Sequence, residues 1–131
     1  RHGSLGEAQD LSLIEVVHRA ILITELRTRA LGIKIDLQWP EEKIIVNGRF
    51  NPLAQAICNV LQNAYEAILT RRKTEETFPG TISVNLREEA SGYTLRIIDD
   101  GAGLDEKIVH QIFDPLFSTK DPDRHSGLGL T

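Results

Sequence analysis

The sequence predicts an α+β domain, and three observations support this class. Two long stretches, 12–32 and 51–72, carry apolar residues at the spacing of an amphipathic helix. Residues 33–38 alternate apolar and polar side chains, which is typical of a half-buried strand. Residues 82–87 and 93–98 alternate in the same way around a short polar connection, which predicts an antiparallel hairpin with one polar face. A chain of 131 residues suffices for one such domain with a core.

Composition and charge argue against several classes of protein. The formal net charge is −4, so there is no general electrostatic basis for binding nucleic acid. The basic cluster Arg71-Arg72-Lys73 is local and could bind phosphate or have no role. A single cysteine, Cys58, excludes an internal disulfide, and its apolar helical context favours a buried thiol over a nucleophile. A single cysteine fits a reducing compartment, and we expect a cytoplasmic domain. No apolar run reaches the roughly 18–20 residues of a membrane span.

The first helix follows a loose segment over residues 1–10. Asp10 or Ser12 could cap it, and Glu15 lies three residues after Ser12, which predicts a capping box. Gly32 is in the usual position for a helix end. The residues expected on its apolar face are Leu13, Val16, Val17, Ala20, Ile21, Ile23 and Leu26.

Between the two helices we expect two strands. The first closes at Trp39-Pro40, and a second short one at 44–46 is followed by an Asn47-Gly48 turn. Asn51 is expected to cap the second helix, with Pro52 in its first turn.

The second helix carries an unusual polar stripe. At 100° per residue its members Gln55, Asn59, Asn63 and Glu66 lie at the edge of the apolar face. Asparagine is a mediocre helix former, so two of them on one stripe need a reason. Amide oxygens can bind a hard cation such as Mg²⁺, or they can simply bond the neighbouring backbone. The residues alone leave both interpretations open.

A glycine turn follows the last predicted strand. Asp99 and Asp100 end the strand and Gly101 and Gly103 follow, which places a fixed carboxylate beside bare backbone. The sequence Asp-Asp-Gly also occurs in ordinary surface turns. After the turn, Asp105 is expected to cap a short helix that contains Ile108, Val109 and Ile112.

Four motifs together resemble a known family. In order they are Asn59-Val-Leu-Gln-Asn63-Ala-Tyr-Glu-Ala67, Asp99-Asp-Gly101-Ala-Gly103-Leu, Phe113-Asp-Pro-Leu-Phe117-Ser-Thr-Lys120 and Gly127-Leu-Gly129-Leu130. They match the N box, the first glycine box, the F box and most of the second glycine box of the ATP-binding catalytic domain of sensor histidine kinases. This domain is similar to that of gyrase B, heat-shock chaperones and mismatch-repair ATPases. The residues of the N box and of the F box are most similar to those of the nitrogen-regulation branch of these kinases. The resemblance covers residues 11–131 and implies a two-layer α/β sandwich of the Bergerat type, with helices on one face of a mixed, largely antiparallel sheet.

The resemblance implies a role for each matching residue. Asn63 would bind the Mg²⁺ that bridges the phosphates of ATP, and Asn59 would support that site. Asp99 would accept a hydrogen bond from the adenine amino group, while Gly101 and Gly103 would let the chain pass close to the base. A buried carboxylate can distinguish an amino-bearing base from a keto-bearing one, because the wrong partner leaves it unpaired.

The remaining roles fall on the C-terminal part of the chain. Residues 113–126 would form a lid over the triphosphate, and Gly127 and Gly129 would present backbone N–H groups to the phosphates. Glu66 and Lys120 are the candidate catalytic residues. The other candidate nucleotide contacts are Phe113, Phe117, Ser118, Thr119, Lys120 and Leu128.

The implied function is autophosphorylation in two-component signalling. The domain would bind Mg-ATP and supply its γ-phosphate to a histidine on a separate dimerisation domain of a kinase that can be membrane-anchored, and the phosphate would pass to a response regulator. In the gyrase-like branch a glutamate at the position of Asn59 activates water. An amide cannot take a proton, which favours transfer to a side chain over hydrolysis. A non-catalytic nucleotide- or protein-binding module and a serine kinase of the anti-sigma type are the alternatives.

Three departures from the family pattern matter. No phosphoacceptor histidine motif is present, so we expect this chain alone to be inactive. His125 stands where the family has the first glycine of the second glycine box, and its side chain could crowd the phosphates or donate to them. The sequence stops at Thr131, where the family continues into a helix and strands. An incomplete edge predicts weakened nucleotide binding and association into a homodimer.

Overall fold

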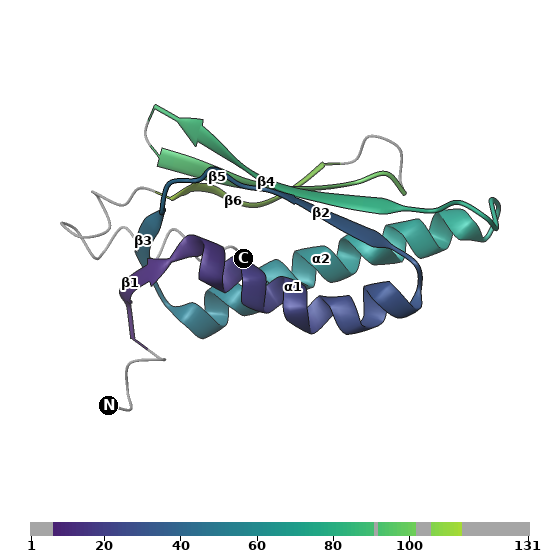
Figure 1. Cartoon of the computed structure of the whole chain (residues 1–131), viewed down its shortest axis with the longest axis horizontal. Coiled ribbons are helices and arrows are strands. Elements are labelled where there is room, and N and C mark those ends of the chain that lie inside the picture. The colour runs from purple at the N-terminus through teal and green to yellow at the C-terminus, as the bar shows by residue number, and fades with distance from the viewer. Residues whose placement is uncertain (1–6, 91, 102–105, 114–131) are drawn as a thin grey trace.

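The computed structural model describes residues 7–90 and 92–101, and the backbone of residues 106–113. The elements are β1 (Gln9–Ser12), α1 (Leu13–Ala30), β2 (Lys34–Gln38), β3 (Ile45–Gly48), α2 (Phe50–Arg72), β4 (Thr81–Glu89), β5 (Gly92–Asp99) and β6 (Glu106–Phe113). Both helices lie on one face of a sheet with the strand order β2-β4-β5-β6 (Figure 1). The predicted α+β class and two-layer arrangement are therefore confirmed.

The main sheet is mixed and largely antiparallel. β2 pairs with β4 in parallel, whereas β4–β5 and β5–β6 are antiparallel. The pairing of β2 stops at Gln38, opposite Asn85, although β4 continues to Glu89. The tip of the predicted hairpin therefore projects beyond the edge of its parallel neighbour.

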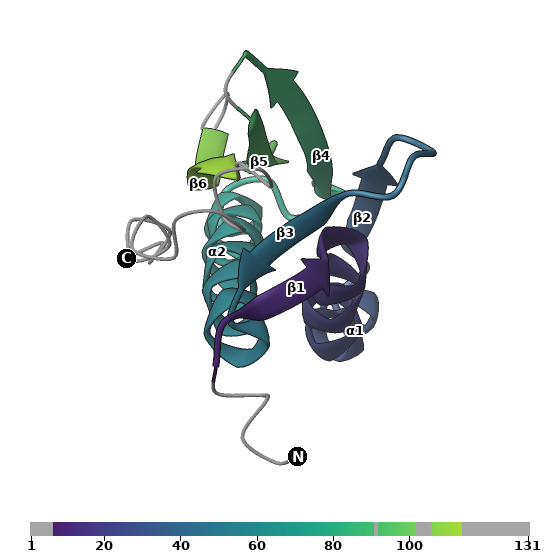
Figure 2. The same cartoon turned by 90° about the vertical axis from the view of Figure 1, so that its left-hand side faces the viewer.

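A separate two-stranded ribbon joins the starts of the two helices. β1 pairs antiparallel with β3, from Gln9 opposite Gly48 to Ser12 opposite Ile45, as Figure 2 shows from the end of the molecule. The Asn47 amide also donates to Asp10 Oδ1 at 3.0 Å. Two predictions are therefore wrong. Residues 9–10 are not loose, and Asn47-Gly48 is not a turn, because each segment supplies the hydrogen-bonding partner of the other.

The helix ends differ from the predictions in their first turns. Ser12 is the N-cap of α1 but makes no side-chain cap hydrogen bond, and the Leu13 N–H instead donates to the Ile44 carbonyl at 2.9 Å. α2 begins at Phe50 with Arg49 as its N-cap, so Asn51 lies inside the first turn instead of capping it. In both cases the strand that leads into the helix fixes its start. Gly32 follows α1 with φ of 70°, as expected of a helix-ending glycine.

The core lies between the helices and the sheet. The largest fully buried side chains are Leu13, Val16, Val17, Val46, Ile57, Leu61, Ile68, Ile82, Val84, Leu95 and Ile97. Two residues predicted on the apolar face of α1 are exposed instead, Ile23 and Leu26, the latter by 83%. Leu26 follows Val17 by nine residues, which is half a turn out of phase with the core at 100° per residue. No described helix combines the length and apolar character that a membrane span requires.

The segment after the glycine turn is a strand instead of the predicted helix. β6 pairs with β5, from Glu106 opposite Ile98 to Phe113 opposite Tyr93, and the register shifts on both sides of Leu95. The expected cap, Asp105, lies outside the described residues. β-Branched residues favour strands, and β5 offers this segment an edge with unpaired backbone groups.

Cys58 is predicted to react slowly with thiol reagents. Its thiol is half-buried against α1 and donates to the Ala20 carbonyl at 3.7 Å. Burial raises the pKa of the Cys58 thiol, and a hydrogen bond with the Thr24 side chain opposes this with a smaller effect. Because the thiolate is the nucleophile, we expect its reaction with an aromatic disulfide near pH 8 to be roughly tenfold slower than that of free cysteine. Equal rates in the folded and urea-unfolded protein would contradict this.

Candidate nucleotide site

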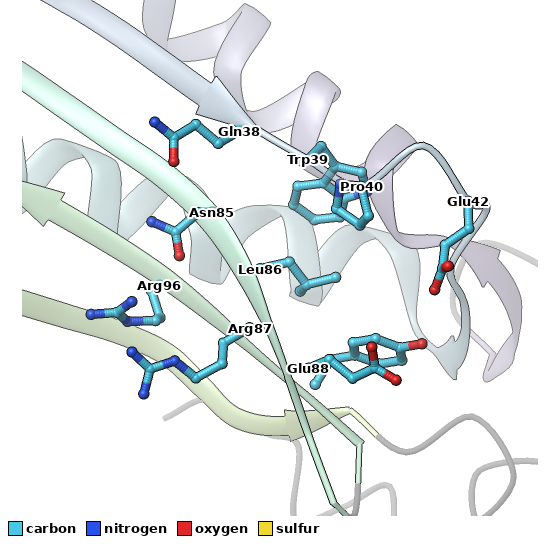
Figure 3. A pocket seen from close by; sticks show the side chains of 10 residues that line it. Gln38, Trp39, Pro40, Glu42, Asn85, Leu86, Arg87, Glu88 and Arg96 are labelled. Carbon is cyan, nitrogen blue, oxygen red and sulfur yellow. The ribbon is translucent and has the colours of Figure 1, made fainter.

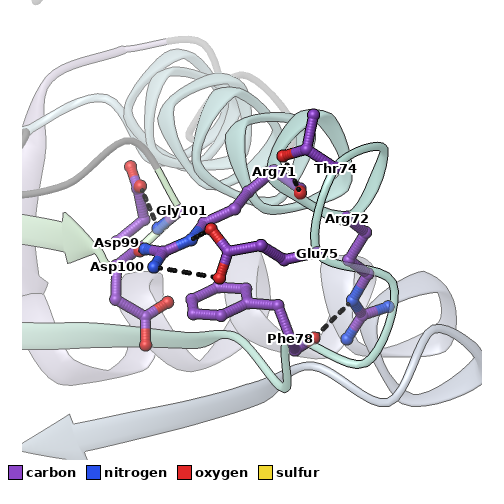
Figure 4. A network of polar contacts seen from close by, with 8 residues as sticks. All are labelled: Arg71, Arg72, Thr74, Glu75, Phe78, Asp99, Asp100 and Gly101. Carbon is purple, nitrogen blue, oxygen red and sulfur yellow. Dashed lines mark hydrogen bonds and ion pairs between the residues drawn. The ribbon is translucent and has the colours of Figure 1, made fainter.

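Asp99 is a buried carboxylate at the last position of β5. Its side chain is 1% exposed and shares the helix-facing side of the sheet with the buried Ile97. Its Oδ1 accepts a hydrogen bond from the Gly101 N–H at 2.9 Å. Asp100 is half-buried, and its Oδ1 accepts from the Thr81 N–H at 2.9 Å. Figure 4 shows the two carboxylates pointing in different directions, so they do not form an acid–base pair.

Gly101 brings the turn into contact with the backbone of α2. A Cβ built on Gly101 would lie 2.5 Å from the Ile68 nitrogen and 2.6 Å from the Ala67 carbonyl carbon. Asn63 lies four residues before Ala67, so it is about 6 Å, or one helical turn, further along the same side of α2. Because the turn packs closely on α2, the end of β5 lies near the polar stripe that carries Asn59 and Asn63.

The polar stripe of α2 faces solvent. Asn59, Asn63 and Glu66 are all exposed. The Asn59 amide oxygen accepts from Gln55 Nε2, and Glu66 Oε2 accepts from Gln62 Nε2, each at 3.0 Å. Asn63 makes no side-chain hydrogen bond with the described residues, so local bonding to the backbone does not explain it.

Two arginines that follow the polar stripe on α2 donate hydrogen bonds to backbone carbonyls. Sequence reasoning did not predict these bonds. Arg71 donates from Nη1 to the Asp100 carbonyl at 2.8 Å, and Arg72 donates from Nε to the Phe78 carbonyl (Figure 4). Arg72 also donates to the carbonyls of Leu31 and Pro79. The helical spacing of Arg71 and Glu75 was the only available signal, and these two form an ion pair at 2.9 Å. Both guanidinium groups already make hydrogen bonds within the domain, so neither is available to bind phosphate.

Asn63 fits the chemistry of a magnesium ligand in one respect. No group of three or more His, Cys, Asp or Glu side chains in the described residues could enclose a metal ion. Mg²⁺ usually keeps several waters and takes only one or two protein ligands together with substrate phosphates. One exposed amide oxygen on a rigid helix is consistent with that pattern.

Several predicted site residues are not brought together by the described structure. Phe113 ends β6 opposite Tyr93, at the far end of β5 from Asp99. Asp99 lies six positions after Tyr93 along the strand, which is about 20 Å. The nucleotide role of Phe113 therefore stays a prediction. The following lie outside the described residues: Gly103, Phe117, Ser118, Thr119, Lys120, His125, Gly127, Leu128 and Gly129.

A pocket of about 630 Å³ opens elsewhere, where β2 ends and β4 continues. Trp39 and Leu86 are among its lining residues (Figure 3). Tyr93 also lines it. Burial raises the pKa of the Tyr93 hydroxyl, and the carboxylates of Glu88 and Glu42 raise it further. Neither Asp99 nor any residue of the asparagine stripe lines this pocket, so it is separate from the candidate site.

Comparisons with known proteins identify the family. Residues 48–131 match the family described as histidine kinase-, DNA gyrase B- and HSP90-like ATPases. The two-component sensor PprA of Pseudomonas aeruginosa is 30% identical over 79% of this chain, and the C4-dicarboxylate transport sensor protein DctB of Rhizobium meliloti is 33% identical over 88%. This chain spans only 11% and 17% of the lengths of these two relatives.

The fold agrees with the same family. The catalytic domain of histidine kinase ThkA superposes with a TM-score of 0.61 at 19% identity, over 72% of this chain and 60% of that one. The nearer resemblance to the nitrogen-regulation branch stays a prediction. From the matched residues, the relatives and the fold, this chain belongs to the histidine kinase-, DNA gyrase B- and HSP90-like ATPases, as an ATP-binding domain of the sensor histidine kinase type.

Proposed function

We propose that this domain binds Mg-ATP and donates its γ-phosphate to a histidine on the dimerisation domain of a two-component sensor kinase. The observation that supports this best is the buried Asp99 carboxylate beside the exposed asparagine side of α2. The carboxylate would take the adenine amino group, and Asn63, supported by Asn59, would hold the Mg²⁺ on the phosphates. Bound Mg²⁺ would neutralise charge that develops during phosphoryl transfer.

Phosphoryl transfer relies mainly on positioning and charge, so the protein itself needs little covalent chemistry. Asn59 carries an amide and cannot activate water, which favours a protein acceptor over hydrolysis. Glu66 and Lys120 are our candidates for assisting the transfer. A response regulator is the proposed recipient of the phosphate, and a solved complex of the kinase ThkA with the response regulator TrrA supports this kind of partnership.

Replacing Asn63 with alanine should weaken Mg-ATP binding about tenfold without lowering stability. Asn63 is exposed, so its removal opens no cavity in the core. Gln62→Ala is the matched control, because Gln62 is an exposed neighbouring amide that bonds only Glu66 among the described residues. Calorimetric titration of ATP, with and without Mg²⁺, measures the effect. Equal affinities in the two variants, or binding that ignores Mg²⁺, would remove Asn63 from the metal site.

A further inference from the structure

We propose that Arg71 is a positioning residue that orients the Asp99 carboxylate and so sets the preference of the site for adenine. This inference rests on the proposed function, because it assumes that Asp99 reads the base. Its evidence is separate and comes from the contacts of Arg71 with the turn that follows β5.

The guanidinium of Arg71 is held on three sides. Its Nε donates to Glu75 Oε2 at 2.9 Å, and its Nη2 reaches Glu75 Oε1 at 3.4 Å. The guanidinium carbon lies 4.0 Å from the centre of the Phe78 ring. An exposed ion pair adds little stability, but a planar fork fixed by a carboxylate and an aromatic ring has a defined direction. That direction places Nη1 2.8 Å from the Asp100 carbonyl oxygen.

The Asp100 carbonyl belongs to the peptide group that holds Asp99. Its C=O and the Gly101 N–H share one planar unit, and that N–H donates to Asp99 Oδ1 at 2.9 Å. Arg71, the peptide and Asp99 therefore form one continuous chain of hydrogen bonds. A cation on the carbonyl polarises the peptide and strengthens its N–H as a donor. Arg71 thus fixes the peptide plane and, through it, the rotation of the carboxylate.

The opposite side of the same turn is tied to β4. The Asp100 carboxylate accepts from the Thr81 N–H at 2.9 Å, and the Asp100 N–H donates to the Thr81 carbonyl at 3.3 Å. These bonds hold the strand in the sheet but do not contact the Asp100–Gly101 peptide. Among the described side chains, only those of Arg71 and Asp99 make hydrogen bonds to that peptide group.

Arg72 supplies a matched control. It is the next residue on α2 and also donates to carbonyls, at 2.8 Å to Phe78 and 2.7 Å to Pro79. Its third partner is the Leu31 carbonyl at the end of α1. These contacts fasten the connection between α2 and β4 and leave the Asp99 turn untouched. Its removal should lower stability without changing how the base is read.

The test compares Arg71→Gln, Arg71→Lys and Arg72→Gln. Calorimetric titration with Mg-ATP and Mg-GTP gives the preference for an amino-bearing over a keto-bearing base, and thermal unfolding gives stability. We expect Arg71→Gln to reduce the ATP/GTP preference about tenfold, with partial rescue in Arg71→Lys, which keeps a cation. Arg72→Gln should keep the wild-type preference and lower only the Tm. Hydrogen exchange of the Gly101 amide should accelerate in Arg71→Gln and not in Arg72→Gln.

The outcomes separate this inference from the proposed function. If Arg71→Gln keeps both the ATP/GTP preference and slow exchange at Gly101, Arg71 is not a positioning residue, whatever its effect on Tm. If the wild-type chain does not prefer ATP over GTP, the proposed reading of the base by Asp99 fails, and this inference fails with it. Faster exchange at Gly101 with an unchanged preference also overturns the inference, because the turn would then move without consequence for the base.

Discussion

Replacing Gly101 with alanine is expected to destabilise the domain by about 3 kcal/mol and to weaken nucleotide binding with it. The added Cβ would lie 2.5 Å from the Ile68 nitrogen and 2.6 Å from its Cα. Both atoms belong to the backbone of α2, so they cannot move aside as a flexible side chain could. Relief requires the turn to lift from α2, which separates Asp99 from the asparagine side of the helix.

The matched control is Gly48→Ala. A Cβ at Gly48 would meet only the Leu11 Cδ1 atom, at 4.0 Å, which is ordinary contact. Urea unfolding should therefore show a large fall in the midpoint for Gly101→Ala and a change within about 0.5 kcal/mol for Gly48→Ala. Similar midpoints for the two variants would show that the turn does not need its contact with α2.

Replacing Asp99 with asparagine should lower the affinity for Mg-ATP by roughly ten- to a hundredfold, which corresponds to about 1–3 kcal/mol. The amide keeps one oxygen that can accept from Gly101, so the turn can persist. Its NH₂ group, however, places a donor where the carboxylate offered an acceptor to the adenine amino group. The binding loss should be larger for ATP than for GTP, and calorimetric titration of both nucleotides measures it.

Asp100→Asn is the control for Asp99→Asn. Asp100 precedes Gly101 and also carries a carboxylate, but its partner is the Thr81 N–H on β4. An asparagine oxygen can accept that bond equally well, so nucleotide affinity should stay near the wild-type value. If the two variants lose affinity equally, the effect comes from charge or stability in general, and the assignment of Asp99 to the base is wrong.

The spacing of apolar residues predicted most of the fold, because the period of a helix or a strand is visible within a short stretch of sequence. The apolar faces of α1 and α2 and the alternation in β4 and β5 depend on periods of 3.6 and 2 residues, which any short window shows. The β1–β3 ribbon depends instead on pairing between segments more than 30 residues apart, such as Gln9 with Gly48. β6 was predicted as a helix because Ile108, Val109 and Ile112 also fit helical spacing, and the free edge of β5 decided between the two.

The candidate site divides in the same way. Asp99, Gly101 and Asn63 could be found from the sequence because side-chain identity and spacing carry the signal. The contact of Gly101 with α2 could not be found from the sequence, and neither could the hydrogen bond from Arg71 to the Asp100 carbonyl. A backbone carbonyl is present at every residue, so a side chain that binds one leaves no trace in the partner's sequence.

The ribbon of β1 and β3 has a mechanical consequence. β1 runs directly into α1 at Leu13, and β3 leads through Arg49 into α2 at Phe50, so one ladder of hydrogen bonds ties the entry points of both helices. Tension applied along the chain at Gln9 would load that ladder in shear, with its bonds sharing the force. The two helices would then be displaced as a pair. A force applied at the amino end of the domain would reach α2, which carries the asparagines, without first unfolding α1.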